Sequence, residues 1–147
     1  MLKSGRFAPI VWFVIVAGSL LTSLPKSVFA VEVVVNKSVP VSTFSLEDLQ
    51  AVFSMQKRNW SKHRQIKVFI LPESSQTHQD FVKHGLRMFS HQIRRIWDRM
   101  IYSGSGAPPV ELSSEKEMIN KIANTPDAIG YLSAKPDNEN IRVINYH

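Results

Sequence analysis

The chain has no cysteine among its 147 residues. This absence excludes a disulfide framework, a thiol nucleophile and a zinc site with thiolate ligands. A single domain of this size without cross-links must be stabilised by its hydrophobic core alone. The histidines lack the one-turn or paired spacing of metal ligands, so we interpret them as surface residues and expect no metal site. They are His63, His78, His84, His91 and His147.

The chain also lacks a glycine-flanked serine directly after a predicted strand, which is where a hydrolase nucleophile would stand. Ser74 and Ser75 follow a predicted strand and precede a predicted helix, but no glycine stands beside them. We therefore expect a non-catalytic protein without a cofactor, and an envelope hydrolase that uses Ser74 or Ser75 is a remote alternative. The sequence shows no internal repeat and no low-complexity segment.

Long hydrophobic runs are absent except at the N-terminus. Lys3 and Arg6 precede an almost wholly apolar run from Ala8 to Leu24. In Val28-Phe29-Ala30, Val28 and Ala30 are the small residues at the minus-three and minus-one positions of a cleavage site. This order predicts a secretory signal peptide over residues 1–30, with cleavage after Ala30. An uncleaved anchor is the alternative, since the run lies at the lower edge of bilayer-spanning length. We expect a periplasmic protein consisting of one domain, residues 31–147.

The charge of this domain is mild. The leader contains three basic residues and no acid, so the net charge of +6 falls to +3 once residues 1–30 are removed. Such a charge attracts anions only weakly. Export and the lack of exposed aromatics between basic residues argue against nucleic acid as a partner.

Apolar periodicity predicts strands that alternate with helices. Strands are expected at 31–36, 66–71, 128–132 and 141–146, and helices from 46 to 53, from about 77 to 89, from 91 to 101 and from 115 to 122. Ser45, Ser90 and Ser114 are the expected helix caps. This order is typical of an α/β domain with a mixed sheet flanked by about four helices.

The segment between the second strand and the second helix is the first candidate binding site. Ser74-Ser75-Gln76-Thr77 places hydroxyls and unpaired backbone N–H groups at a helix start, where the helix dipole favours an anion. An ordinary helix cap is the simpler alternative and needs only one of these hydroxyls.

Two further features stand near the third helix. Basic residues concentrate on two consecutive helices and indicate either an anion-attracting face or a solvated one; they are Lys83, Arg87, Arg94, Arg95 and Arg99. Asp98 lies four residues after Arg94 and can pair with it. Ser103-Gly104-Ser105-Gly106 is either a helix end with a turn, which Gly104 suits, or a second loop beside the ligand.

Four segments resemble, in order and spacing, the periplasmic phosphate-binding-protein-like domains related to the solute-binding component of phosphate ABC transporters. They are LQAVFSMQKRNW (49–60), FILPESSQTHQDF (69–81), WDRMIYSGSGAPP (97–109) and TPDAIGYL (125–132). The resemblance covers nearly all of residues 31–147. It implies a type II periplasmic-binding-protein fold, of which this chain supplies a single lobe.

The resemblance also implies an anion site at the 74–77 loop. Ser75 and Thr77 match its hydroxyl donors, Ser74 supports the loop, and His78 and Arg87 are candidate charge partners. Ser103, Gly104, Ser105 and Gly106 are expected to form the opposite wall. The chain departs from the family pattern at Leu71, where an arginine is expected, and at Gln76, where a glycine is expected, while Glu73 keeps the acidic position.

These observations predict a periplasmic solute-binding protein that takes phosphate or another small oxyanion for an ABC permease or a linked membrane sensor. An interaction module from a different functional class is the alternative. Such a module would bind no solute and would dock on a membrane receptor or sensor. An exposed apolar patch where a second lobe would sit would favour that module or a homodimer.

Overall fold

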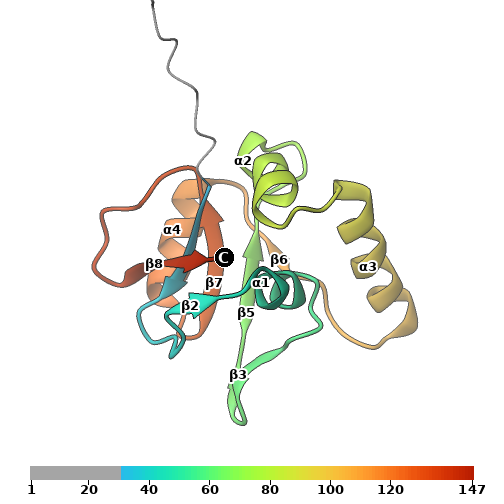
Figure 1. Ribbon diagram of the computed structural model, residues 1–147, viewed down its shortest axis with the longest axis horizontal. Coiled ribbons are helices and arrows are strands. Elements are labelled where there is room, and N and C mark those ends of the chain that lie inside the picture. Colours follow the sequence, from blue (N-terminus) through green and yellow to red (C-terminus); the bar gives the residue numbers. More distant parts are fainter. Residues whose placement is uncertain (1–30) are drawn as a thin grey trace, which may run out of the picture.

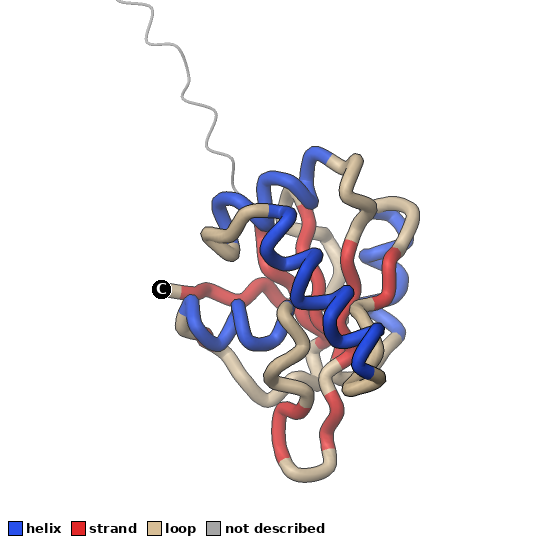
Figure 2. The backbone as a smooth tube through the Cα atoms, turned by 90° about the vertical axis from the view of Figure 1, so that its right-hand side faces the viewer, coloured by secondary structure: helices blue, strands red, loops and turns tan. Residues whose placement is uncertain are grey.

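The computed structural model describes residues 31–147, and the predicted leader lies outside the described residues. A mixed six-stranded sheet has the order β2-β8-β1-β7-β5-β6. Its strands are β1 (Glu32–Asn36), β2 (Thr43–Phe44), β5 (Lys67–Ile70), β6 (Val110–Glu111), β7 (Ala128–Leu132) and β8 (Ile141–Tyr146). Strands β3 (Asn59–Ser61) and β4 (Arg64–Gln65) form a separate hairpin, which projects at the bottom of Figure 2.

The helices are α1 (Leu46–Phe53), α2 (Gln76–Asp80), α3 (Ser90–Ser103) and α4 (Glu115–Asn124). A π-helical turn, η1 (Phe81–Gly85), continues α2. Helix α4 packs on β1, β7 and β8 and lies behind the sheet in Figure 1, whereas α1 lies in front of it. No helix in residues 31–147 is long and apolar enough to cross a membrane.

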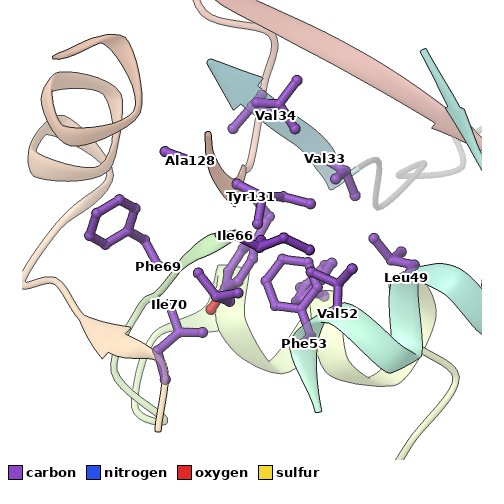
Figure 3. Close-up of a cluster of buried hydrophobic side chains, with 14 of the residues drawn as sticks. Val33, Val34, Leu49, Val52, Phe53, Ile66, Phe69, Ile70, Ala128 and Tyr131 are labelled. Carbon is purple, nitrogen blue, oxygen red and sulfur yellow. The ribbon is translucent and has the colours of Figure 1, made fainter. Parts of the chain in front are cut away.

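The sheet is buried on both faces because helices cover both. Val33 and Val34 of β1 point to opposite faces, as neighbouring strand residues must, and Figure 3 shows Val33 on the side of α1 and Val34 on the other side. Helix α1 contributes Leu49, Val52 and Phe53, which are fully buried. Phe53 contacts Phe81 edge-on, with ring centroids 4.6 Å apart. The central strand β7 is buried along its whole length.

The four predicted strands and four predicted helices are all present, in the predicted order. Ser45 and Ser114 cap α1 and α4 through their hydroxyls, as expected. Strands β2, β3, β4 and β6 were not predicted, because two or three residues are too short to show an alternating pattern.

The second helix ends earlier than its apolar pattern predicts. It stops at Leu86, whose carbonyl accepts a hydrogen bond from Gln50 Nε2 at 2.7 Å, and Arg87 then takes a left-handed conformation with φ 52°. Phe89, the last residue of the predicted helix, therefore lies outside the observed helix and is 65% exposed. Phe89 rather than Ser90 is the cap residue of α3, because Gln92 Oε1 accepts from its backbone N–H.

The prediction that the histidines are surface residues is wrong for His78, of which only 1% is exposed. Its position in the first turn of α2 faces the sheet, and its ring packs beside Tyr131 of β7. Helix α3 buries Ile93, Trp97 and Met100, whereas Ile101, the last residue of the predicted third helix, is 49% exposed.

Candidate functional site

The predicted anion-binding segment lies where β5 runs into α2. We call residues 73–77 the loop site. Strand β5 ends at Ile70, Pro72 breaks the run, and the Ser75 N–H donates to the Pro72 carbonyl at 2.8 Å, which closes the turn. Ser75 has an extended backbone and caps α2 by accepting from His78 N, at a long 3.5 Å. The loop site is therefore a helix cap in its local structure, as the simpler alternative requires.

The loop site retains donors that the cap does not use. No acceptor in residues 31–147 takes the backbone N–H groups of Gln76 and Thr77, which belong to the first turn of α2. The Ser75 hydroxyl accepts a hydrogen bond and keeps its own proton for donation. The Ser74 side chain is exposed. These groups could together hold one small oxyanion.

A carboxylate from a distant part of the sequence already takes one predicted donor. The Thr77 hydroxyl donates to Glu115 Oε1 at 2.5 Å. The other oxygen, Oε2, accepts from the Ser133 N–H at 3.1 Å and from the Ser133 hydroxyl at 2.8 Å. Glu115 is the first residue of α4 and Ser133 follows β7, so two elements meet α2 here. A negative charge thus lies beside the loop site.

A second acid belongs to the loop itself and is paired. Glu73 Oε1 lies 2.5 Å from Arg94 Nη1, and both side chains are about half exposed. The predicted Arg94–Asp98 pair is present as well, at 3.9 Å. The Glu73 carboxylate raises the pKa of the Arg94 guanidinium, through a hydrogen bond and through Coulomb attraction. Arg94 of α3 thus brings a positive charge to the loop site, and Glu73 neutralises it.

A cluster of buried polar groups supports the loop site from the side of strand β7. The Tyr131 hydroxyl accepts from the Leu71 N–H at 2.8 Å and lies 2.6 Å from His78 Nδ1. Tyr131 also stacks on Phe81 with ring centroids 4.0 Å apart. Burial raises the pKa of the Tyr131 hydroxyl and lowers the pKa of His78, while Glu73 opposes the shift at His78. The cluster joins β5, α2 and β7, and both side chains are neutral at physiological pH.

The hydrogen-bond pattern indicates which nitrogen of His78 carries the proton. The Tyr131 oxygen already accepts from Leu71, and its own proton has one acceptor within reach, His78 Nδ1. The proton of the imidazole then lies on Nε2, a buried atom without a hydrogen-bond partner. A neutral, buried imidazole gives no positive charge to an anion, so the geometry does not support His78 as a charge partner.

The remaining predicted residues lie elsewhere. Arg87 follows η1, at the end of the helical segment opposite Ser75, and ten intervening helical residues correspond to more than about 10 Å. The Ser103–Gly106 loop lies at the end of α3 away from α2 (Figure 1). Gly104 caps α3 with φ 65°, as predicted for a helix end. Ser105 contacts Arg58 rather than the loop site.

Sequence reasoning missed two residues that shape the loop site. Glu115 was visible only as an acid in the first turn of a predicted helix, where it suits the helix dipole. Tyr131 stands in the AIGYL strand, but the pattern did not connect it to His78. Each acts across more than 35 residues of sequence.

Comparison with known proteins places this arrangement in a known fold. No family model matches the chain, and no curated protein matches its sequence. Its structure is similar to an ABC-type phosphate transport receptor from Vibrio cholerae, with TM-score 0.58 and 20% identity over 79% of this chain. It is also similar to a putative phosphate ABC transporter substrate-binding protein with bound phosphate from Clostridium perfringens, with TM-score 0.63 and 13% identity over 79% of this chain. A third similar structure is PstS from Borrelia burgdorferi, with TM-score 0.58 and 16% identity over 80% of this chain.

The chain spans less than half the length of these structures, since it covers 45%, 44% and 47% of them. The fold class predicted from the sequence is confirmed: the chain has the α/β fold of phosphate-transport substrate-binding proteins, over less than half of their length. The resemblance inferred from the four sequence segments is therefore confirmed at the level of the fold.

Proposed function

We propose that the protein is a periplasmic, non-catalytic binding protein that holds phosphate or a similar small oxyanion at the loop site. The Ser74 and Ser75 hydroxyls and the N–H groups of Gln76 and Thr77 donate to the anion. Residues 1–30 serve as the export signal. The bound anion is delivered to an ABC permease or reported to a linked membrane sensor.

One observation supports this proposal above the others. The loop site stands between the end of β5 and the start of α2, with two backbone N–H groups free, in a lobe whose fold is shared with three phosphate-transport proteins. Free N–H groups at a helix start are a recurrent way to hold phosphate.

Glu115 sets a condition on this function. Because its carboxylate takes the Thr77 hydroxyl, an arriving anion must share that hydroxyl with Glu115 or displace the carboxylate. Arg94 can compensate in part, if the anion draws the guanidinium away from Glu73. The proposal therefore predicts weaker binding than a site with an arginine in place of Leu71 would give, by about 1.5–3 kcal/mol.

Isothermal titration of the exported protein with phosphate tests the proposal, with sulfate as the specificity control. A double variant, Ser75→Ala with Thr77→Ala, should lose phosphate binding and keep the circular dichroism spectrum of the wild type. Ser61→Ala, in the exposed β3–β4 hairpin, is the matched control and should bind as the wild type does. Equal affinity in the double variant would remove the loop site from the function.

Mass spectrometry of the same preparation tests export. Expression of the full-length chain should give a periplasmic protein that begins at Val31. A membrane-bound protein that retains residues 1–30 would mean that the apolar run serves as an anchor.

A second candidate function is favoured by a different observation. Four large apolar side chains are exposed: Phe89 just before α3, Ile101 and Tyr102 near the end of α3, and Val110 in β6. They stand on a chain that covers less than half of its structural neighbours. An interaction module that docks on a membrane receptor or sensor through this surface would need no bound solute.

Light scattering and crosslinking distinguish the two candidate functions. A Tyr102→Ser, Ile101→Ser variant should abolish self-association or capture of an envelope partner if α3 is a docking surface. If the variant and the wild type are both monomeric and give the same crosslinking pattern, α3 does not serve as a docking surface.

A further inference from the structure

A groove of about 480 Å³ lies between the segment that follows α1 and the second half of α3. Figure 2 shows α3 on the side that faces the viewer, with the loop that leads from α1 toward the hairpin beside it. Arg58 and Arg99 line the groove together with Ser103 and Ser105. We call this groove the arginine pocket. It contains two of the residues that the sequence predicted for an anion site, but none from the loop site.

Arg58 is held in place by the backbone. Its Nε donates to the Met55 carbonyl at 3.1 Å, and its Nη2 donates to the Ser105 carbonyl at 2.8 Å. A guanidinium has five N–H groups, so three remain for a ligand. Gly106 allows this position, because a Cβ there would lie 2.7 Å from Arg58 Nη2. The guanidinium is thus oriented before a ligand arrives, which lowers the entropy cost of binding.

The charge of the arginine pocket is not neutralised by the protein. No Asp or Glu lines it, and in residues 31–147 neither Arg58 nor Arg99 has an ion-pair partner. The neighbouring groove around Arg94 differs, since Glu73, Asp98 and Glu111 line it as well. Two unpaired arginines in one concave site attract an anion from solution.

The rest of the lining indicates what kind of anion fits. Met55, Ile96 and Met100 supply apolar surface beside the two arginines. An inorganic ion would leave this surface uncovered, whereas an apolar group attached to the ion would cover it. The guanidinium fork suits the two oxygens of a carboxylate or a phosphate.

We infer that the arginine pocket is a second binding site, for a small organic oxyanion in which a carboxylate or phosphate is attached to an apolar body. Arg58 and Arg99 bind the charged group, the Ser103 and Ser105 side chains border it, and the three apolar residues contact the body. This inference does not rest on the proposed function, because the two sites share no residue.

Titration with phenyl phosphate, monitored by ¹H–¹⁵N NMR of the exported protein, tests the inference. Phenyl phosphate should shift the Arg58 side-chain signal and the amides of Ser103, Gly104 and Ser105. It should bind more tightly than inorganic phosphate does at the same signals. Phenol, which keeps the apolar body without the charge, should leave these signals unchanged.

Two arginine variants separate this site from general charge. Arg99→Gln should weaken phenyl phosphate binding by about tenfold or more, since a charge-assisted contact is lost. Arg95→Gln removes the same charge from an exposed position of α3 outside the pocket, and it should bind as the wild type does. Gly106→Ala should weaken binding by displacing Arg58, and loss of the Arg58 shift in an otherwise native spectrum would show that effect.

Three results would overturn the inference. The first is no shift at Arg58 with the wild-type protein. The second is equal weakening by Arg95→Gln and Arg99→Gln, which would mean diffuse attraction to α3. The third is loss of phenyl phosphate binding in the Ser75→Ala, Thr77→Ala variant alone, which would place the ligand at the loop site. If the Ser75→Ala, Thr77→Ala variant still binds phenyl phosphate but no longer binds inorganic phosphate, the result supports both sites.

Discussion

The loop site and the arginine pocket both contain serines that were predicted from the sequence to bind an anion. The two sites differ in how their charged side chains are arranged. At the loop site, Glu115 takes the Thr77 hydroxyl and Glu73 pairs with Arg94. At the arginine pocket, backbone carbonyls hold Arg58, and no acid lies beside it. At the first site Arg94 and the Thr77 hydroxyl already have carboxylate partners, and only the N–H groups of Gln76 and Thr77 and the serine hydroxyls remain for an anion. The second site is exposed and keeps its positive charge.

Donor residues alone therefore do not make an anion site. Hydroxyls and helix-start N–H groups are available only if the fold brings no carboxylate to them. Thr77 and Glu115 lie 38 residues apart, and nothing in the spacing of either segment indicates that they meet. The sign of the local charge is therefore a tertiary property.

Loss of the buried hydroxyl should give the largest effect, and it would break the rigidity of the loop site. Tyr131→Phe leaves the Leu71 N–H and His78 Nδ1 without partners inside the protein. We expect the free energy of unfolding to fall by about 2–4 kcal/mol, measured by urea denaturation. Tyr146→Phe, at a half-buried tyrosine whose hydroxyl makes no hydrogen bond within residues 31–147, should cost less than about 0.5 kcal/mol. Similar costs for the two variants would contradict the role of this cluster.

Removal of the internal carboxylate charge should make the loop site resemble the arginine pocket. Glu115→Gln keeps an oxygen that accepts from Thr77 but removes the negative charge. We expect phosphate to bind about five- to tenfold more tightly at the loop site, as measured by titration calorimetry. Glu117→Gln, which alters the other first-turn acid of α4, should have no such effect because Ser113 holds Glu117. A gain in both variants would indicate net charge rather than Glu115 as the cause.

The buried His78 beside the loop site should make the free energy of unfolding fall in mild acid. The arginine pocket contains no histidine, so it should not contribute to this pH dependence. Burial lowers the pKa of His78 in the folded protein, so the unfolded chain binds the proton first as the pH falls below about 6.5. The free energy of unfolding is therefore highest above that pH and should decrease by about 1 kcal/mol per pH unit below it. His78→Gln should flatten this slope, while His63→Gln, at an exposed position, should keep it. Urea midpoints between pH 7.5 and about 5 would measure the difference, and equal slopes would rule out His78 as the source.

Loss of the exposed ion pair should give the smallest effect. Arg94→Gln breaks the contact with Glu73, but both side chains are about half exposed and water screens the pair. We expect a stability change of less than about 1 kcal/mol, which decreases further at high salt. Thermal unfolding at low and high ionic strength measures this change. A larger, salt-independent loss would mean that Arg94 supports the loop site structurally.

Much of the fold could be predicted because its signals are local. Strands β1, β5, β7 and β8 are apolar runs long enough to recognise, and Ser45 and Ser114 are capping residues with acids in the turn that follows. The short edge strands β2 and β6 could not be predicted, since two residues contain no period and exist only because β8 and β5 provide pairing partners. The early end of the second helix also depends on a remote contact, the hydrogen bond from Gln50 to Leu86.

The candidate site was predictable only in part. Residues 74–77 lie at the start of a helix, as the sequence predicted, because a proline-terminated strand followed by serines is a local signal. The sequence grouped Ser103–Gly106 with these residues, whereas in the structure α3 separates that loop from α2 (Figure 1). The burial of His78 was also missed, because the sequence does not show whether a histidine in the first turn of a helix faces the core or the solvent.

The absence of disulfides and thiol chemistry, the order of the main elements and the position of the serine-rich turn follow from the amino-acid sequence, because composition and periodicity act within a few residues. Which donors stay free depends on how distant segments pack. Packing of α4 and α2 against β7 brought Glu115 to Thr77, and packing of α3 beside α1 placed Arg58 and Arg99 around one groove without an acid. Coulomb forces and hydrogen bonds depend on distance in space, and distance in space follows from the packing of segments far apart in the chain.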